Sequence, residues 1–158
     1  MGFYPVESVE MLVKIASNVG SHRQRLTVRE LFQGIDYQDK VLPAHLIAIG
    51  VEASIECVSP AAVFVPTLSG ATARNIARSR LPVWIIAISS QQTTCQTLQF
   101  SSGVFPVLEM EPPEDWKAYV RAWLQKHELW GDLVVLTEGP SLKHPEANHR
   151  MEIIDLKK

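Results

Sequence analysis

Short apolar runs rich in β-branched residues alternate with helix-like segments from residue 61 onward. Near-continuous apolar character is typical of a strand that is covered on both faces. Alternation of such strands with helices predicts βαβ units, a mostly parallel sheet and a three-layer α/β sandwich. The predicted strands are residues 61–65, 83–88, 104–108 and 133–136, and the predicted helices between them are 72–80, 93–100 and 114–127.

A fifth apolar run, residues 151–156, follows the fourth after a segment without helical periodicity. That segment contains two prolines, Pro140 and Pro145. A parallel crossover usually needs a dozen or more residues and commonly a helix. We therefore expect the fifth strand to be antiparallel and to lie at or near an edge of the sheet.

The N-terminal part of the chain has a different texture. Residues 6–19 carry apolar side chains at helical spacing, with Pro5 in the first turn and Gly20 as the expected end of an amphipathic helix. A polar stretch with a short helix around 28–32 comes next, and a further helix is expected over 43–57. The predicted organisation is a helix in residues 1–20, a connector in 21–40 and one α/β domain in 41–158.

Length and charge exclude several classes of protein. The 158 residues suit a single domain and are too few for a complete (β/α)8 barrel, which typically needs about 250. Fifteen basic against 17 acidic residues do not favour nucleic acid or an anionic membrane surface as a partner. The N-terminus lacks a signal-peptide pattern and no apolar run reaches membrane-spanning length, so we expect a cytoplasmic protein.

The loop after the first predicted strand is the first candidate site. Thr67, Ser69, Gly70 and Thr72 place hydroxyls and a glycine where a helix begins, an arrangement that can hold a phosphate. The alternative is that Ser69 or Thr67 only caps the helix. The spacing matches neither a P-loop nor a nucleophile elbow.

The loop after the fourth predicted strand is the second candidate. Lys143, His144, His149 and Arg150 are all able to contact an anion, although a solvated surface loop would show the same polarity. Two histidines without further ligands do not make a zinc site, so no metal is expected.

A third candidate lies on the last predicted helix. Its apolar stripe is best interpreted as the core face, but Trp116, near the start of the helix, could instead stack on a ligand. The stripe consists of Trp116, Tyr119, Val120, Trp123 and Leu124.

The remaining titratable residues suggest no catalysis. Glu52 and Glu56, one helical turn apart, are expected to form a solvated acidic edge, and Cys57 and Cys95 to be reduced, buried thiols. No nucleophile lies in a recognisable relation to a base, so an independent enzyme acting on a phosphorylated or alcohol substrate is the least favoured hypothesis.

Six segments in order resemble the pyruvate kinase family. Residues 2–9 resemble the family's Gly-x-Tyr-Pro-x-Glu-Ala-Val, and the loop at 65–74 resembles its Thr-x-Ser-Gly-x-Ser/Thr-Ala effector loop. The other segments are 50–54, 82–88, 103–108 and 131–137. These segments are spread across nearly the whole chain.

The resemblance implies the family's C-terminal domain, preceded by the last helix of the catalytic barrel. It implies strand order 3-2-1-4-5, with the fifth strand antiparallel and a pocket at the switch point between strands one and four. In the family this pocket binds sugar phosphates or nucleotide effectors, and the domains self-associate, so at least a dimer is expected. The family's catalytic residues lie in the barrel, so neither catalysis nor a cofactor is expected of this chain.

Only some of the family's site residues are matched in this sequence. The four residues of the first loop match the phosphate-cradling positions, but Leu68 and Ala71 stand where many members have Lys or Arg. Lys143, His144 and Arg150 are the candidates that would compensate. Two functions therefore stay open: a regulatory, effector-binding domain, or an interaction module whose pocket has degenerated.

Overall fold

The computed structural model contains one five-stranded sheet of order β3-β2-β1-β4-β5. Neighbouring strands are parallel except for the antiparallel pair β4–β5. The antiparallel edge strand confirms the prediction from the sequence pattern, and the strand order is the one that the family resemblance implies. The strands are β1 (Ala62–Pro66), β2 (Trp84–Ser89), β3 (Val104–Leu108), β4 (Leu133–Glu138) and β5 (Arg150–Asp155). The structure describes residues 4–22, 43–111, 113–139 and 148–157.

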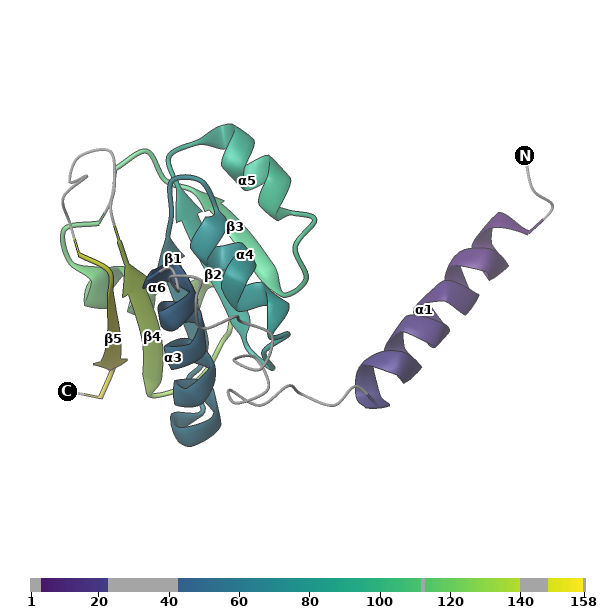
Figure 1. The fold of residues 1–158 in the computed structure, drawn as a ribbon, viewed down its shortest axis with the longest axis horizontal. Helices are drawn as coiled ribbons and strands as arrows, with labels where there is room; N and C mark the ends of the chain where they lie inside the picture. Colours follow the sequence, from purple (N-terminus) through teal and green to yellow (C-terminus); the bar gives the residue numbers. More distant parts are fainter. Residues whose placement is uncertain (1–3, 23–42, 112, 140–147, 158) are drawn as a thin grey trace, which may run out of the picture.

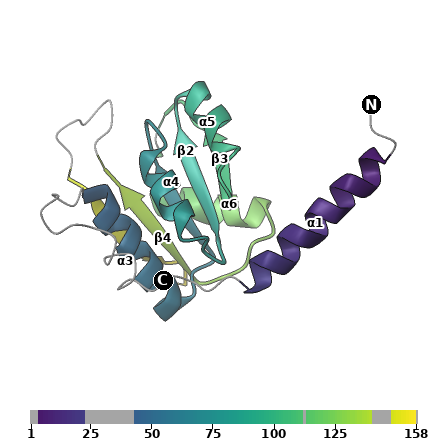
Figure 2. The same cartoon turned by 45° about the vertical axis from the view of Figure 1, so that its right-hand side comes forward.

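Helices cover both faces of the sheet and complete the three layers (Figures 1 and 2). One face carries α3 (Pro43–Val58), α4 (Ala71–Arg78) and α5 (Gln92–Leu98), which share a core cluster with Val63, Ile85 and Val135. The other face carries α6 (Trp116–Lys126) over a second cluster that includes Phe64, Ile86 and Leu136. Adjacent strand residues thus alternate between two cores, which explains the continuous apolar runs.

The apolar stripe of α6 is its core face, as predicted. Val120, Trp123 and Leu124 are buried, and Trp116 and Tyr119 pack against the same cluster. Just before the helix, the Asp115 carboxylate accepts a hydrogen bond from the Ala118 N–H at 3.0 Å and caps the first turn.

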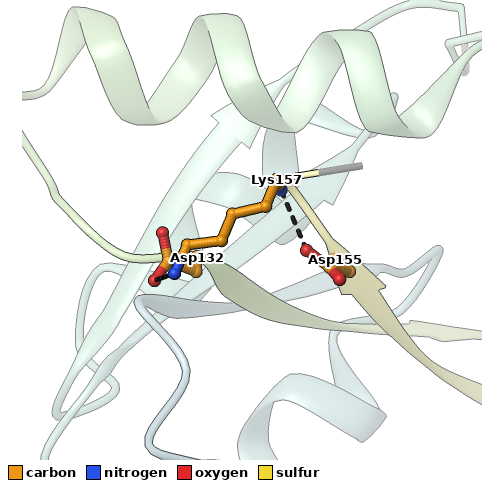
Figure 3. A network of polar contacts seen from close by, with 3 residues as sticks. All are labelled: Asp132, Asp155 and Lys157. Atoms are coloured by element: carbon orange, nitrogen blue, oxygen red, sulfur yellow. Dashed lines mark hydrogen bonds and ion pairs between the residues drawn. The ribbon is translucent and has the colours of Figure 1, made fainter.

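Polar contacts fasten β5 to β4 at both ends. At the start of β5, Arg150 pairs in register with Glu138, and the two side chains form an ion pair. At the other end, Lys157 Nζ lies 2.6 Å from an Asp132 carboxylate oxygen, and its backbone N–H donates to Asp155 Oδ1 at 2.9 Å (Figure 3). The antiparallel edge strand is therefore held by its ladder and by contacts at each end.

The N-terminal helix α1 runs from Pro5 to His22, so the expected end at Gly20 is wrong. A glycine costs only about 1 kcal/mol inside a helix, which one turn of continued hydrogen bonding can absorb. All side chains of residues 4–19 are exposed, including the apolar stripe with Val9, Leu12 and Val13. The predicted connector and its short helix around 28–32 lie outside the described residues. No described helix has the length and apolarity needed to cross a bilayer.

Two expectations about α3 are wrong. Glu52 is not at a solvated edge: it is 4% exposed, because α4 packs over that side of α3, whereas Glu56 one turn later is exposed. Cys57 is exposed. It lies two residues after Ile55, the last buried residue of α3, and on the outer side of the helix. Cys95 is buried as expected, and burial raises the pKa of its thiol.

Candidate functional site

The strand order reverses between β1 and β4, which are parallel neighbours. Val63 lies opposite Val135 and Phe64 opposite Leu136, so both strands end at the same edge of the sheet. Ligands of open α/β sheets bind at this kind of position, outside the carboxyl ends of the strands. The two loops selected from the sequence leave the sheet here.

The β1–α4 loop is held in one shape by hydrogen bonds. Thr67 Oγ1 accepts from the Gly70 N–H at 3.0 Å, and the Thr67 N–H donates to the Ile88 carbonyl at 2.8 Å. Thr94, at the start of α5, donates its hydroxyl to the Leu68 carbonyl at 2.8 Å. The turn is therefore braced from both β2 and α5.

The residue that caps α4 is Gly70, with φ at +76° and no side-chain hydrogen bond to the helix. Neither Ser69 nor Thr67 caps the helix, because the Thr67 hydroxyl accepts its hydrogen bond from the N–H of Gly70, the residue before α4. Ser69 is exposed, and Thr67 and Thr72 are partly exposed. Solvent reaches this loop beside the N-terminus of α4, where the helix dipole favours an anion.

Arg74 is a site residue that the sequence analysis did not select. Its Nη2 donates to the Ser69 carbonyl at 2.8 Å, and a β-carbon added at Gly70 would lie 2.9 Å from its Nη1. The guanidinium therefore lies over the loop, near the positions where Leu68 and Ala71 lack a charge. The signal in the sequence was its position one helical turn after Gly70.

Thr137 is the second residue that was missed. It stands near the end of β4, one residue beyond the Phe64–Leu136 pair, and is 1% exposed. Within the described part of the chain its hydroxyl has no hydrogen-bond partner. Such orphaned buried groups are uncommon and call for an explanation. A hydroxyl directly after the apolar run 133–136 was the available signal.

The second loop is described only at its two ends. Lys143 and His144 lie outside the described residues. Arg150 begins β5 and is engaged with Glu138, while the ring of His149 lies close over Gly139, where an added β-carbon would come within 2.9 Å of its Nδ1. The described ends of the loop are thereby held together at the edge of the sheet.

Trp116 lies at the first position of α6, half-buried against the α6-side core. Its ring meets that of Tyr119 edge-to-face at 5.8 Å, and burial together with the neighbouring Glu109 carboxylate raises the pKa of Tyr119. Its partial burial leaves ligand stacking as a prediction.

The groups at this edge of the sheet are chemically suited to hold an anion. Hydroxyls, the N-terminus of a helix and one guanidinium converge there, and the described residues bring no nucleophile together with a base. No group of three His, Cys, Asp or Glu residues within the described part of the chain is arranged to hold a metal ion.

Comparison with known proteins agrees with this architecture. The family model described as "Pyruvate kinase, alpha/beta domain" matches residues 45–154. Pyruvate kinase of Thermococcus litoralis is 36% identical over 160 residues, which cover 99% of this chain and 33% of that protein. Human pyruvate kinase PKLR is 30% identical over 151 residues, covering 87% of this chain and 26% of that protein.

Solved structures show the same fold. A Cryptosporidium parvum pyruvate kinase in complex with ADP superimposes with a TM-score of 0.75 at 18% identity, covering 98% of this chain and 32% of that one. At that identity the likeness concerns the fold alone. The chain thus spans about a third of the length of the relatives it matches. With a family model over most of its length and a 36% identical relative, the chain belongs to the pyruvate kinase family, and residues 45–154 correspond to the family's C-terminal α/β domain.

Proposed function

We propose that this domain is a non-catalytic regulatory unit that binds a small phosphate compound, a sugar phosphate or a nucleotide, at the carboxyl ends of β1 and β4. The observation that carries the proposal is the β1–α4 loop. It combines the exposed Ser69, the left-handed Gly70 and the N-terminus of α4 at the switch point of the sheet. This geometry suits a phosphate group.

Arg74 supports the same ligand class. Charged hydrogen bonds are roughly twice as strong as neutral ones, and a guanidinium fits two phosphate oxygens at once. Its present partner, the Ser69 carbonyl, is exposed, so the guanidinium can exchange this contact for a phosphate at little cost. The cations Lys143, His144 and Arg150 stay candidates for the far side of the ligand, and Trp116 for stacking.

Isothermal titration of the 158-residue chain with inorganic phosphate, sugar mono- and bisphosphates and nucleotides tests the proposal. Arg74→Gln should weaken binding about tenfold or more, since a charged hydrogen bond contributes about 1.5–3 kcal/mol. Arg78→Gln is the matched control: it removes the same charge from the last residue of α4 and should leave the affinity unchanged. Heat from none of these compounds would remove the effector role.

The second candidate function is an interaction module whose pocket has degenerated. Leu68, 37% exposed, and Ala71 favour it, because both stand where many members of the family have a cation. This candidate predicts no ligand, and self-association that persists when Thr67 and Ser69 are both replaced by alanine.

Both candidates include self-association to at least a dimer. The exposed apolar stripe of α1 supports it, since large exposed apolar patches are rare on monomers and mark surfaces that a partner covers. Light scattering at micromolar concentration measures the mass directly, and a monomer would contradict this part of the proposal.

A further inference from the structure

A pocket of about 220 Å³ lies between α3 and α4, apart from the β1–α4 loop. From α3 it is lined by His45, Ala48, Ile49 and Glu52. From α4 and the residue after it, the lining is Asn75, Arg78 and Ser79. A cavity of about 150 Å³ already holds benzene, so this one has room for a somewhat larger molecule.

The buried carboxyl group of Glu52 is the unusual feature of this pocket. The side chain is 4% exposed, and its Oε2 accepts a hydrogen bond from the Ser79 hydroxyl at 2.9 Å. Burial, and to a lesser degree the nearby Glu56 carboxylate, raises the pKa of Glu52, while the Ser79 hydrogen bond opposes this. No ion pair joins Glu52 to another residue that the structure describes.

A buried carboxylate without a counter-charge is unfavourable, and one hydroxyl compensates it only in part. The Glu52 carboxylate has further acceptor positions next to the pocket, and a cationic hydrogen-bond donor there would stabilise its charge. Ala48 and Ile49 add apolar lining, and Asn75 adds a polar amide side chain. Arg78 is exposed, so the repulsion between its positive charge and a cation in the pocket is largely screened by solvent.

We propose that the α3–α4 pocket binds a small organic cation, an ammonium or guanidinium group on a short apolar stem. The cationic group pairs with Glu52, and the stem packs against Ala48 and Ile49. A guanidinium fits best, because its planar donors match a carboxylate in pairs. The site is independent of the phosphate loop, so either can fail without the other.

The test is a pair of isosteric probes, n-butylguanidinium and its neutral analogue n-butylurea. They are titrated into the isotopically labelled 158-residue chain at low ionic strength and about pH 8, well above the ordinary pKa of a carboxyl group. Amide shifts in α3 and α4 report binding. We expect butylguanidinium to bind with a dissociation constant on the order of 1 mM, as suits so small a ligand, and butylurea about tenfold or more weaker.

Three variants are expected to change the affinity for the two probes in different ways. Glu52→Gln keeps an acceptor for Ser79 and the shape of the pocket, so it should weaken butylguanidinium about tenfold and leave butylurea unchanged. Arg78→Gln removes a like charge and should tighten the cation about twofold. Arg74→Gln, in the phosphate loop, should change neither probe.

A stability measurement guards against a Glu52→Gln variant that merely perturbs packing. Because the folded-state pKa of Glu52 is raised, its contribution to stability is present below the ordinary value of 4.5 and lost as pH rises through the raised pKa. Glu52→Gln should abolish this component of the pH dependence. In the wild type, butylguanidinium should restore the lost stability at high pH.

Equal affinity for the two probes, or full cation affinity in Glu52→Gln, would overturn the proposal. So would a butylguanidinium affinity that weakens as the protein concentration rises through the range of self-association, because a side chain of a second copy would then be the occupant.

Discussion

At Gly70 both the backbone conformation and the surrounding side chains oppose any residue larger than glycine. Its φ of +76° is left-handed, and a β-carbon there would lie 3.0 Å from Leu98 Cδ2 and 3.2 Å from Cδ1. It would also approach Arg74 Nη1, but that atom ends a flexible, exposed side chain. Leu98 is 0% exposed in the core, so it has little room to move.

Gly70→Ala should therefore cost two separate amounts. A left-handed alanine costs about 1–2 kcal/mol, and overpacking against a buried side chain about 1–3 kcal/mol more. The sum of about 2–5 kcal/mol corresponds to a fall in Tm of roughly 4–20 °C for a chain of this size. Gly103→Ala is the control, because φ there is +73° and a β-carbon would meet nothing within 4 Å.

Urea unfolding of both variants measures the difference in the free energy of unfolding. The effect of Gly→Ala on the unfolded chain is common to both and cancels. Gly70→Ala should be the less stable by about 1–3 kcal/mol, and in a Leu98→Ala background it should cost only the backbone part. Equal costs for Gly70→Ala and Gly103→Ala would refute the contact with Leu98.

Substitutions at two further positions test the environments of Thr137 and Asp115. Thr137→Val replaces by a methyl group a buried hydroxyl that has no partner among the described residues. It should raise the free energy of unfolding by about 1 kcal/mol, whereas a loss would mean that the hydroxyl has a partner in solution. Asp115→Ala removes the cap of α6 and should lower the free energy of unfolding by about 1 kcal/mol in chemical denaturation, while Asp115→Asn, which keeps an acceptor, should lose much less.

Much of the fold could be predicted because its signals are local. A strand covered on both faces is a continuous apolar run, and the short sequence segment without helical periodicity before β5 favoured the antiparallel return that the structure shows. The core face of α6 followed from spacing alone. The loop with Thr67, Ser69 and Gly70 was found because its position, after a strand and before a helix, can be read from the chain.

Element ends were less predictable, since they depend on which hydrogen bonds the surroundings complete. α1 continues past Gly20, and α4 begins at Ala71 because Thr67 bonds the Gly70 N–H before the helix starts. The helical pattern does not contain that information. It depends on a turn braced by β2 and α5.

Periodicity and segment length in the sequence determined the succession of strands and helices along the chain and the antiparallel edge strand. That the two loops meet at a switch point followed from the strand order that the family resemblance implies. Only the tertiary structure decided the environments of individual polar groups. Glu52 is buried because α4 lies against α3, and the Arg74 guanidinium lies beside Gly70. The Thr137 hydroxyl is buried without a hydrogen-bond partner among the residues that the structure describes. Solvation and charge compensation depend on neighbours distant in the chain, which local patterns do not encode.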